Sequence, residues 1–200
     1  QFACKELARR MSAPTQDDWG ALKRLVRYLV YRPRVVVCFD RQARQDTIDG
    51  YSDADWAGCP HSRKSTSSSY LMVGTHLLAS SSTTQTVIAT SSGESEFYAA
   101  VKTASRVLGG AAMAKDLALV LDPRVMIDAS AAKGIASRRG VGKVRHLHVG
   151  TLWLQQAVHE RRLRLQKQPG QENVADLGTK RLAAATLEHC IRLAGMRMLS

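Results

Sequence analysis

Four acidic residues stand at positions where acids are unusual in a folded domain. Asp53 lies within a strand-like segment, and Asp128 directly follows the short apolar run 125–127. Glu96 falls in the first turns of a long helical pattern, and Asp176 lies at the start of the last one. A carboxylate in or at the end of a buried strand loses hydration unless it is paired or binds a metal. Taken singly, each of these acids also fits a structural role.

Together, the four carboxylates indicate a site for divalent cations. Converging carboxylates repel one another, and a bound cation removes that repulsion. Oxygen ligands favour Mg²⁺ or Mn²⁺ over Zn²⁺. In many nucleases two such ions, about 4 Å apart, catalyse phosphodiester hydrolysis. The expected cofactor is therefore two Mg²⁺ (or Mn²⁺) ions, with no small-molecule cofactor. Thiolate chemistry is not indicated, because the four cysteines are scattered and form no C-x-x-C pair.

The charge balance points to a polyanionic partner. The chain has 29 Lys+Arg against 17 Asp+Glu, a net charge of +12. Nucleic acid is the first expectation for such a chain. No apolar run approaches the ~20 residues of a membrane span, and no membrane partner is expected. The basic excess concentrates in 138–167, which is either a surface for a nucleic-acid backbone or a solvated basic face. The predicted nucleic-acid-binding residues are Arg138, Arg139, Lys143, Arg145 and His146.

Hydrophobic periodicity and breakers predict the elements that must position these residues. Two helices are expected before 32, separated by a break at 11–15, with a short strand at 35–39 and a polar linker at 40–47. Ser91 and Glu94 have the spacing of a capping box at the start of the long helix. The later elements are strands at 48–57, 69–73 and 76–89, a helix to about 120, a strand at 125–127, helices at 130–137 and 148–160, a strand at 163–167, and a helix at 173–193 interrupted near Gly178.

This order of elements predicts an α/β fold. Three consecutive strands followed by alternating helices and strands are typical of a mixed sheet with helices on its faces. In such sheets ligands bind at the carboxyl ends of strands. Asp128 lies at such an end, which agrees with a site built from the four acids.

Five short motifs occur in order along the chain: YSDADWAG at 51–58, RKSTS at 63–67, TSSGESEF at 90–97, VMID at 125–128 and NVADLGTK at 173–180. Their combination resembles the ribonuclease H domain of copia-type LTR retrotransposon Pol polyproteins, over about 48–182. The resemblance implies a ribonuclease H-like mixed five-stranded sheet flanked by helices, with a short N-terminal helical segment. Residues 1–39 are similar to the C-terminal end of reverse transcriptase (thumb- or connection-like). The expected division is therefore 1–39, a linker at 40–47, and a ribonuclease H-like domain at 48–200.

The resemblance also implies an activity. In that family the positions of Asp53, Glu96, Asp128 and Asp176 hold the catalytic metals. The implied reaction is endonucleolytic hydrolysis of the RNA strand of RNA–DNA hybrids during reverse transcription, by a two-metal mechanism. The implied partners are the hybrid and the rest of the Pol polyprotein. The expected location is intracellular, in a cytoplasmic particle or the nucleus, rather than secreted.

Two departures from the family pattern keep alternatives open. Cellular members of the fold carry a histidine in the loop before the last acid, but the loop at 167–172 has none here. In addition, Asp128 is followed by Ala129 and Ser130, where family members often have Asn-Gln. One alternative is a catalytically inactive retrotransposon remnant that only binds nucleic acid. A second is another nuclease or an integrase-type enzyme on the same fold, which cleavage of duplex DNA would distinguish.

Overall fold

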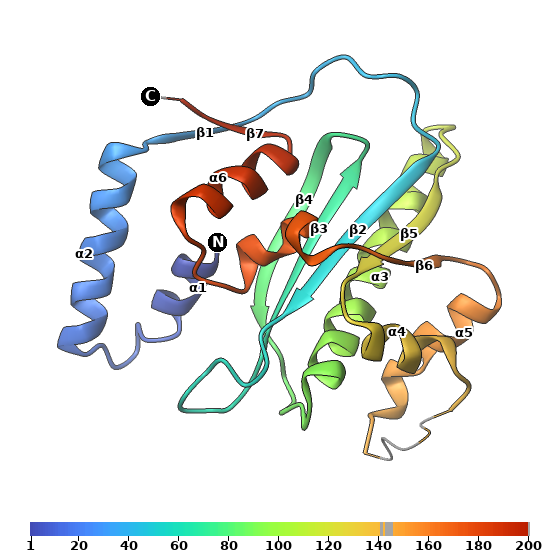
Figure 1. The fold of residues 1–200 in the computed structure, drawn as a ribbon, viewed down its shortest axis with the longest axis horizontal. Coiled ribbons are helices and arrows are strands. Elements are labelled where there is room, and N and C mark those ends of the chain that lie inside the picture. Colours follow the sequence, from blue (N-terminus) through green and yellow to red (C-terminus); the bar gives the residue numbers. More distant parts are fainter. Residues whose placement is uncertain (141, 143–145, 200) are drawn as a thin grey trace.

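A five-stranded mixed sheet forms the centre of the computed structural model, which describes residues 1–140, 142 and 146–199 (Figure 1). The strand order is β4-β3-β2-β5-β6. Neighbouring strands among β2, β3 and β4 are antiparallel, whereas β5 runs parallel to β2 and β6 parallel to β5. The predicted mixed five-stranded sheet flanked by helices is therefore confirmed. The strands are β2 (Thr47–Ala54), β3 (Thr66–Val73), β4 (His76–Thr84), β5 (Asp122–Ile127) and β6 (Arg164–Lys167).

Helix α3 (Ser92–Asp116) packs along one face of this sheet and builds the main core. Phe97 and Val107 on the helix and Ile48 on β2 are all buried there. Helix α3 approaches the backbone of β2 closely at Gly50, where a Cβ would overlap the side chain of Val107. Helices α4 (Ser130–Ser137) and α5 (Trp153–His159) extend the same core, and a short 3₁₀ turn, η1 (Val149–Thr151), precedes α5. This packing places the first turn of α3 near the end of β2.

Short helices cover part of the opposite face. They are η2 (Gly170–Glu172), η3 (Val174–Gly178) and α6 (Ala184–Leu193), and a second core joins Val174, Ala175 and Ala194 to side chains of β3. The prediction of one interrupted helix over 173–193 is wrong, because five residues without helical structure separate η3 from α6. Gly178 lies so close to Ser68 that a Cβ would overlap the serine side chain. Ser82 Oγ also donates to the Gly178 carbonyl at 2.5 Å. These contacts with the sheet break the helical pattern.

The N-terminal segment contains the two expected helices and a strand. Helices α1 (Phe2–Ala8) and α2 (Gln16–Tyr31) flank the break, and Thr15 and Asp18 form a capping box. Strand β1 (Arg34–Val37) pairs antiparallel with β7 (Met196–Leu199), a strand that the sequence patterns do not predict. The segment that follows α2 therefore pairs with β7 in a separate two-stranded sheet, while the domain division at 40–47 stays a prediction.

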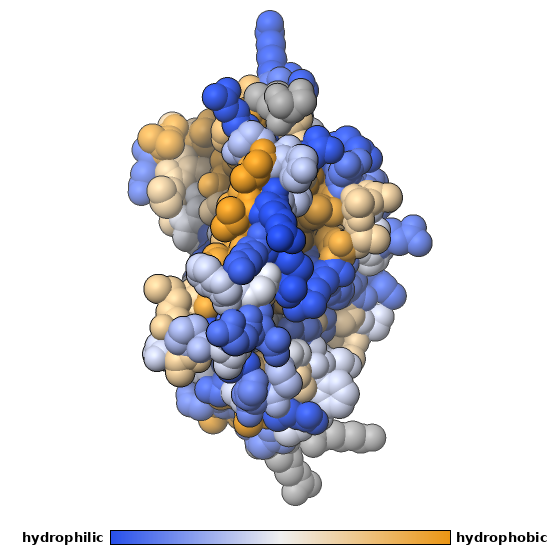
Figure 2. All heavy atoms as spheres, turned by 90° about the vertical axis from the view of Figure 1, so that its left-hand side faces the viewer, coloured by the Kyte–Doolittle hydropathy of each residue, from blue (hydrophilic) through white to orange (hydrophobic). Residues whose placement is uncertain are grey.

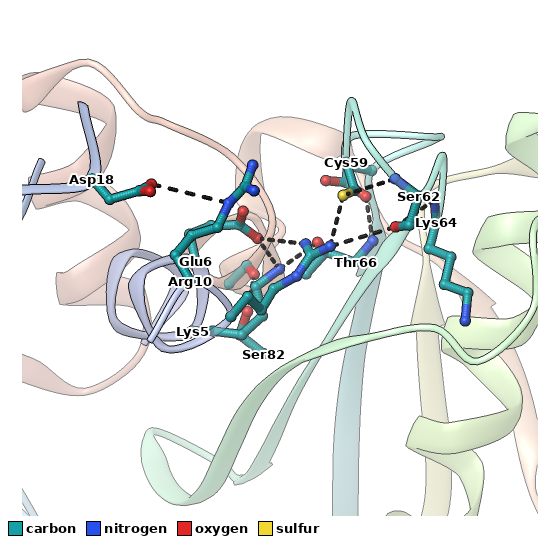
Figure 3. A network of polar contacts seen from close by, with 12 residues as sticks. Lys5, Glu6, Arg10, Asp18, Cys59, Ser62, Lys64, Thr66 and Ser82 are labelled. Atoms are coloured by element: carbon teal, nitrogen blue, oxygen red, sulfur yellow. Dashed lines mark hydrogen bonds and ion pairs between the residues drawn. The ribbon is translucent and has the colours of Figure 1, made fainter. Parts of the chain in front are cut away.

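Polar contacts attach α1 to the connection between β2 and β3 (Figure 3). Lys5 Nζ donates to Thr66 Oγ1 at 2.6 Å, and Arg9 Nη2 lies 2.6 Å from Cys59 Sγ. Neither α1 nor α2 has a fully buried residue. Figure 2 views the molecule from the α2 side, and hydrophobic residues are visible there beside hydrophilic ones. In the part of the chain that the structure describes, no helix is long and apolar enough to cross a membrane.

Candidate active site

Three of the four predicted acids converge at the carboxyl ends of the central strands. Asp53 is in β2, Asp128 directly follows β5, and Glu96 lies in the first turns of α3. The parallel register pairs Tyr51 with Met126, so positions 53 and 128 continue side by side. One carboxylate oxygen from each of the three acids lies within 4.8 Å of the others. The packing of α3 against β2 supplies the third carboxylate.

Two of the three acids are largely removed from water, and Asp128 is half-buried. Asp53 is 1% exposed and Glu96 is 8% exposed. Burial, followed by repulsion from Asp53 and Asp128, raises the pKa of Glu96 to about 9. Burial and then Asp53 also raise the pKa of Asp128. These directions show that the site disfavours three negative charges without a cation.

One oxygen of Glu96 gives a direct test of whether the residues suit a metal ion. Among the described residues, its Oε2 is buried and has no hydrogen-bond partner. An unpaired buried acceptor is costly, and it lies beside two further carboxylates. A hard divalent cation such as Mg²⁺ satisfies this set of oxygen atoms. The donor set therefore fits the expected metal.

Asp176 lies beside this group rather than within it. It belongs to η3, and the side chain of Lys180 contacts both it and Asp53. Lys180 Nζ is 2.7 Å from Asp176 Oδ1 and 3.3 Å from Asp53 Oδ1. Burial, with a contribution from Asp53, raises the pKa of Asp176 to about 6, although Lys180 opposes the shift. The fourth acid thus lies beside Asp53, and both carboxylates contact the same lysine.

Three residues of the last motif support the site, although the sequence analysis assigned them no role. Asn173 Nδ2 donates to the Ser52 carbonyl at 3.0 Å and fixes the start of η3 to β2. The Thr179 hydroxyl donates to Asp53 Oδ2. Lys180 contributes the ammonium group described above. All three belong to NVADLGTK, so the motif was recognised but the contacts of its polar members were not.

The predicted nucleic-acid-binding residues follow the last of the three converging acids, Asp128, in the sequence. Arg139 is exposed and Arg138 is half-buried, both just after α4. His146 Nε2 donates to Glu94 Oε2 at 2.9 Å and lies 3.1 Å from Thr90 Oγ1. His146 is therefore tied to the beginning of α3. Lys143 and Arg145 lie outside the described residues.

Comparison with curated proteins identifies relatives along almost the whole chain. The chain is 27% identical over 198 residues to the retrovirus-related Pol polyprotein from transposon RE2 of Arabidopsis thaliana, which covers 98% of this chain and 14% of the polyprotein. It is 27% identical over 192 residues to the corresponding polyprotein from transposon TNT 1-94 of Nicotiana tabacum, covering 95% of this chain and 14% of that one. The chain is homologous to retrotransposon Pol polyproteins. The resemblance that the motifs indicate is therefore confirmed.

The homologous Pol polyproteins are much longer than this chain, which spans about 14% of the length of each. No protein-family model matches the chain. Among solved structures, it is similar to LC11-RNase H1, crystallised in complex with an RNA/DNA hybrid. That similarity has a TM-score of 0.46 and 18% identity, and it covers 66% of this chain and 94% of the other.

Proposed function

We propose that this Pol-related chain is a ribonuclease H domain that hydrolyses the RNA strand of RNA–DNA hybrids. The observation that carries the proposal is the convergence of Asp53, Glu96 and Asp128 at the carboxyl ends of β2 and β5. The homology to retrotransposon Pol polyproteins supports it, because reverse transcription leaves RNA paired with DNA. The rest of such a polyprotein is the proposed partner in the chain's natural setting, inside the cell.

Each carboxylate has a separate part in this proposal. Asp53, Glu96 and Asp128 hold one Mg²⁺ or Mn²⁺ ion, and Asp176 completes a second position with Asp53. When bound, two such ions activate a water molecule and stabilise the leaving oxygen of a phosphodiester. The protein's own contribution is to keep these carboxylates in place on β2, β5, α3 and η3 before substrate arrives.

Substrate binding is assigned to the basic residues that follow α4. The net charge of +12 favours association with a nucleic-acid backbone. Arg138, Arg139, Lys143, Arg145 and His146 are the proposed contacts. Hybrid and RNA duplexes are bound mainly through backbone shape and charge, so such a surface needs no base-specific side chains.

The test is cleavage of a hybrid labelled on its RNA strand, in Mg²⁺, by the purified chain. Asp128→Asn should abolish cleavage, because it removes a metal-binding charge and keeps the side-chain shape. Asp116→Asn, at the exposed end of α3, is the matched control and should cleave like the wild type. Labelled duplex DNA in a parallel reaction should stay intact.

Each other outcome points to a named alternative. Hybrid binding without cleavage would favour an inactive remnant, or a domain that needs the rest of its polyprotein. Cleavage of duplex DNA at a similar rate would favour another nuclease on the same fold. Cleavage that survives in Asp128→Asn would rule out the proposed metal site.

A further inference from the structure

A lysine side chain contacts two of the acids that the proposed function assigns to metal binding. Lys180 Nζ contacts Asp53 Oδ1 at 3.3 Å and Asp176 Oδ1 at 2.7 Å. The Asp53 side chain is 1% exposed and the Asp176 side chain 16% exposed, whereas that of Lys180 is 44% exposed. The ammonium group thus reaches one buried and one half-buried carboxylate, while the lysine side chain as a whole stays partly open to solvent.

The turn after η3 holds this arrangement in place. The backbone N–H groups of Thr179 and Lys180 both donate to the Asp176 carbonyl, at 3.2 and 3.1 Å. The same turn aims the Thr179 hydroxyl at Asp53 Oδ2. Burial opposes the charge on Lys180, yet Asp53 and Asp176 raise the pKa of its ammonium group above the ordinary value. Lys180 is therefore a built-in monovalent counterion for Asp53 and Asp176.

The carboxylates on the two sides of the acidic site differ in whether a positive charge already lies beside them. On the Asp53–Asp176 side, an ammonium group already neutralises the carboxylates. On the Glu96 side, the buried Oε2 has no hydrogen-bond partner among the described residues. A divalent cation on the Glu96 side would give this unpaired oxygen a partner. A cation on the Asp176 side has to compete with a positive charge within hydrogen-bond distance of the same oxygens.

We propose that Lys180 makes the two cation positions unequal, so that the second, between Asp53 and Asp176, fills only when its ammonium group withdraws. This inference rests on the proposed function, since it presupposes that the carboxylates bind divalent cations. The partial exposure of the Lys180 side chain lets the ammonium group move out toward solvent. Lys180 thereby acts as a positioning residue that sets the order in which the site is filled.

The test is a Mn²⁺ titration of the purified chain without substrate, followed by calorimetry and by the electron paramagnetic resonance of free Mn²⁺. The wild type should show one stronger site and a second, weaker one. Lys180→Met removes the charge and keeps most of the stem. It should tighten the second site by roughly tenfold, the scale on which one nearby charge changes ionic equilibria.

Two further variants separate local charge from other effects. Lys180→Arg keeps the positive charge and should keep the second site weak. Lys115→Met removes a positive charge in the last turn of α3, at the opposite end of that helix from Glu96, and should leave both affinities unchanged. In metal-free buffer Lys180→Met should lower the melting temperature, because Asp53 and Asp176 lose their counterion, and Mn²⁺ should restore it.

The outcomes distinguish this inference from the proposed function. Equal Mn²⁺ affinities and stoichiometry in the wild type and in Lys180→Met would overturn the role of Lys180 while leaving the metal site intact. Tightening in Lys180→Arg as well would overturn the charge mechanism. No Mn²⁺ bound by any variant would overturn the proposed metal site, and the inference with it.

Discussion

His146 Nε2 lies 2.9 Å from Glu94 Oε2, and this contact joins the basic segment after α4 to the first turn of the helix that carries Glu96. The Glu94 side chain is 1% exposed, whereas that of His146 is 51% exposed. Glu94 also accepts hydrogen bonds from the Thr90 backbone N–H and from the Tyr98 hydroxyl. The hydrogen bond from His146, followed by those from Thr90, lowers the pKa of Glu94 although burial opposes the shift. The pair therefore connects the proposed substrate-binding segment to the proposed metal site.

We expect His146→Ala and Glu94→Gln to weaken hybrid binding by a similar factor, because both remove the same contact. The expected loss is roughly fivefold, the scale of one hydrogen bond. Fluorescence anisotropy with a labelled hybrid at fixed salt measures it. The double variant should bind no more weakly than either single one. His159→Ala, at the end of α5, is the control. Losses that add in the double variant would show that the two residues affect binding independently of their mutual contact.

Metal binding should raise the free energy of unfolding of the chain. Mg²⁺ at a hundredfold excess over its Kd should raise the free energy of unfolding of the wild type by about 2.7 kcal/mol. Glu96→Gln should lose most of this gain. In metal-free buffer the same variant should be more stable than the wild type by about 1 kcal/mol, because the glutamine has no charge to bury. Chemical denaturation with and without Mg²⁺ measures both effects. A variant that is less stable without metal would show that Glu96 has a structural role instead.

The pair formed by Asp49 and Arg124 should fix β5 beside β2. Arg124 binds Asp49 through two contacts, Nε to Oδ1 at 2.6 Å and Nη2 to Oδ2 at 2.7 Å. Arg124→Met leaves a nearly buried carboxylate without its partner and should cost about 1–3 kcal/mol of unfolding free energy. The control is Arg197→Met, which breaks an exposed pair with Asp40 and should cost less than about 1 kcal/mol. Equal costs in urea denaturation would contradict this account.

Cys59 should make the stability of the chain depend on pH. Burial opposes ionisation of its thiol, but hydrogen bonding with Ser62 and then with Arg9 lowers the pKa from 9.0 to about 7. The lowered pKa of the Cys59 thiol stabilises the folded chain. This stabilisation is fully present above the ordinary thiol pKa of 9.0, and it is lost as the pH falls through the folded-state pKa of about 7. The stability advantage of the wild type over Cys59→Ser should therefore grow between about pH 6 and about pH 9. Urea denaturation at several pH values measures it.

The control for this experiment is Cys4→Ser, which changes an exposed thiol on α1. Its difference from the wild type should be small at every pH. An advantage of the wild type over Cys59→Ser that stays constant with pH would show that the thiolate does not stabilise the contact with Arg9.

Local patterns predicted most elements of the central fold, because hydrophobic spacing and capping residues act over a few neighbours. Helix α4 begins and ends at the residues expected, and Ser91 caps α3 by accepting from the Glu94 backbone. The side chain of Glu94 departs from a capping box, since it turns to Thr90 and His146. Strand β4 is shorter than expected, ending at Thr84. These differences arise where contacts distant in the chain compete with local ones.

Residue type and motif order were also enough to predict which acids matter, since an aspartate after an apolar strand is costly without a cation. They could not show which of the acids converge. That depends on the parallel register of β2 and β5 and on the close packing of α3 at Gly50. The pairing of β1 with β7 is likewise invisible in either segment alone, because a strand partner at the other end of the chain leaves no local pattern.

The sequence by itself therefore determined the kind of chemistry: four carboxylates on an α/β scaffold, with an excess of positive charge for a polyanion. Only the tertiary structure decided how these charges are arranged. It gathers Asp53, Glu96 and Asp128, and it places the ammonium group of Lys180 against both Asp53 and Asp176. The physical reason is that electrostatic interactions depend on distances of a few ångströms, and the folded packing of β2, β5, α3 and η3 sets those distances.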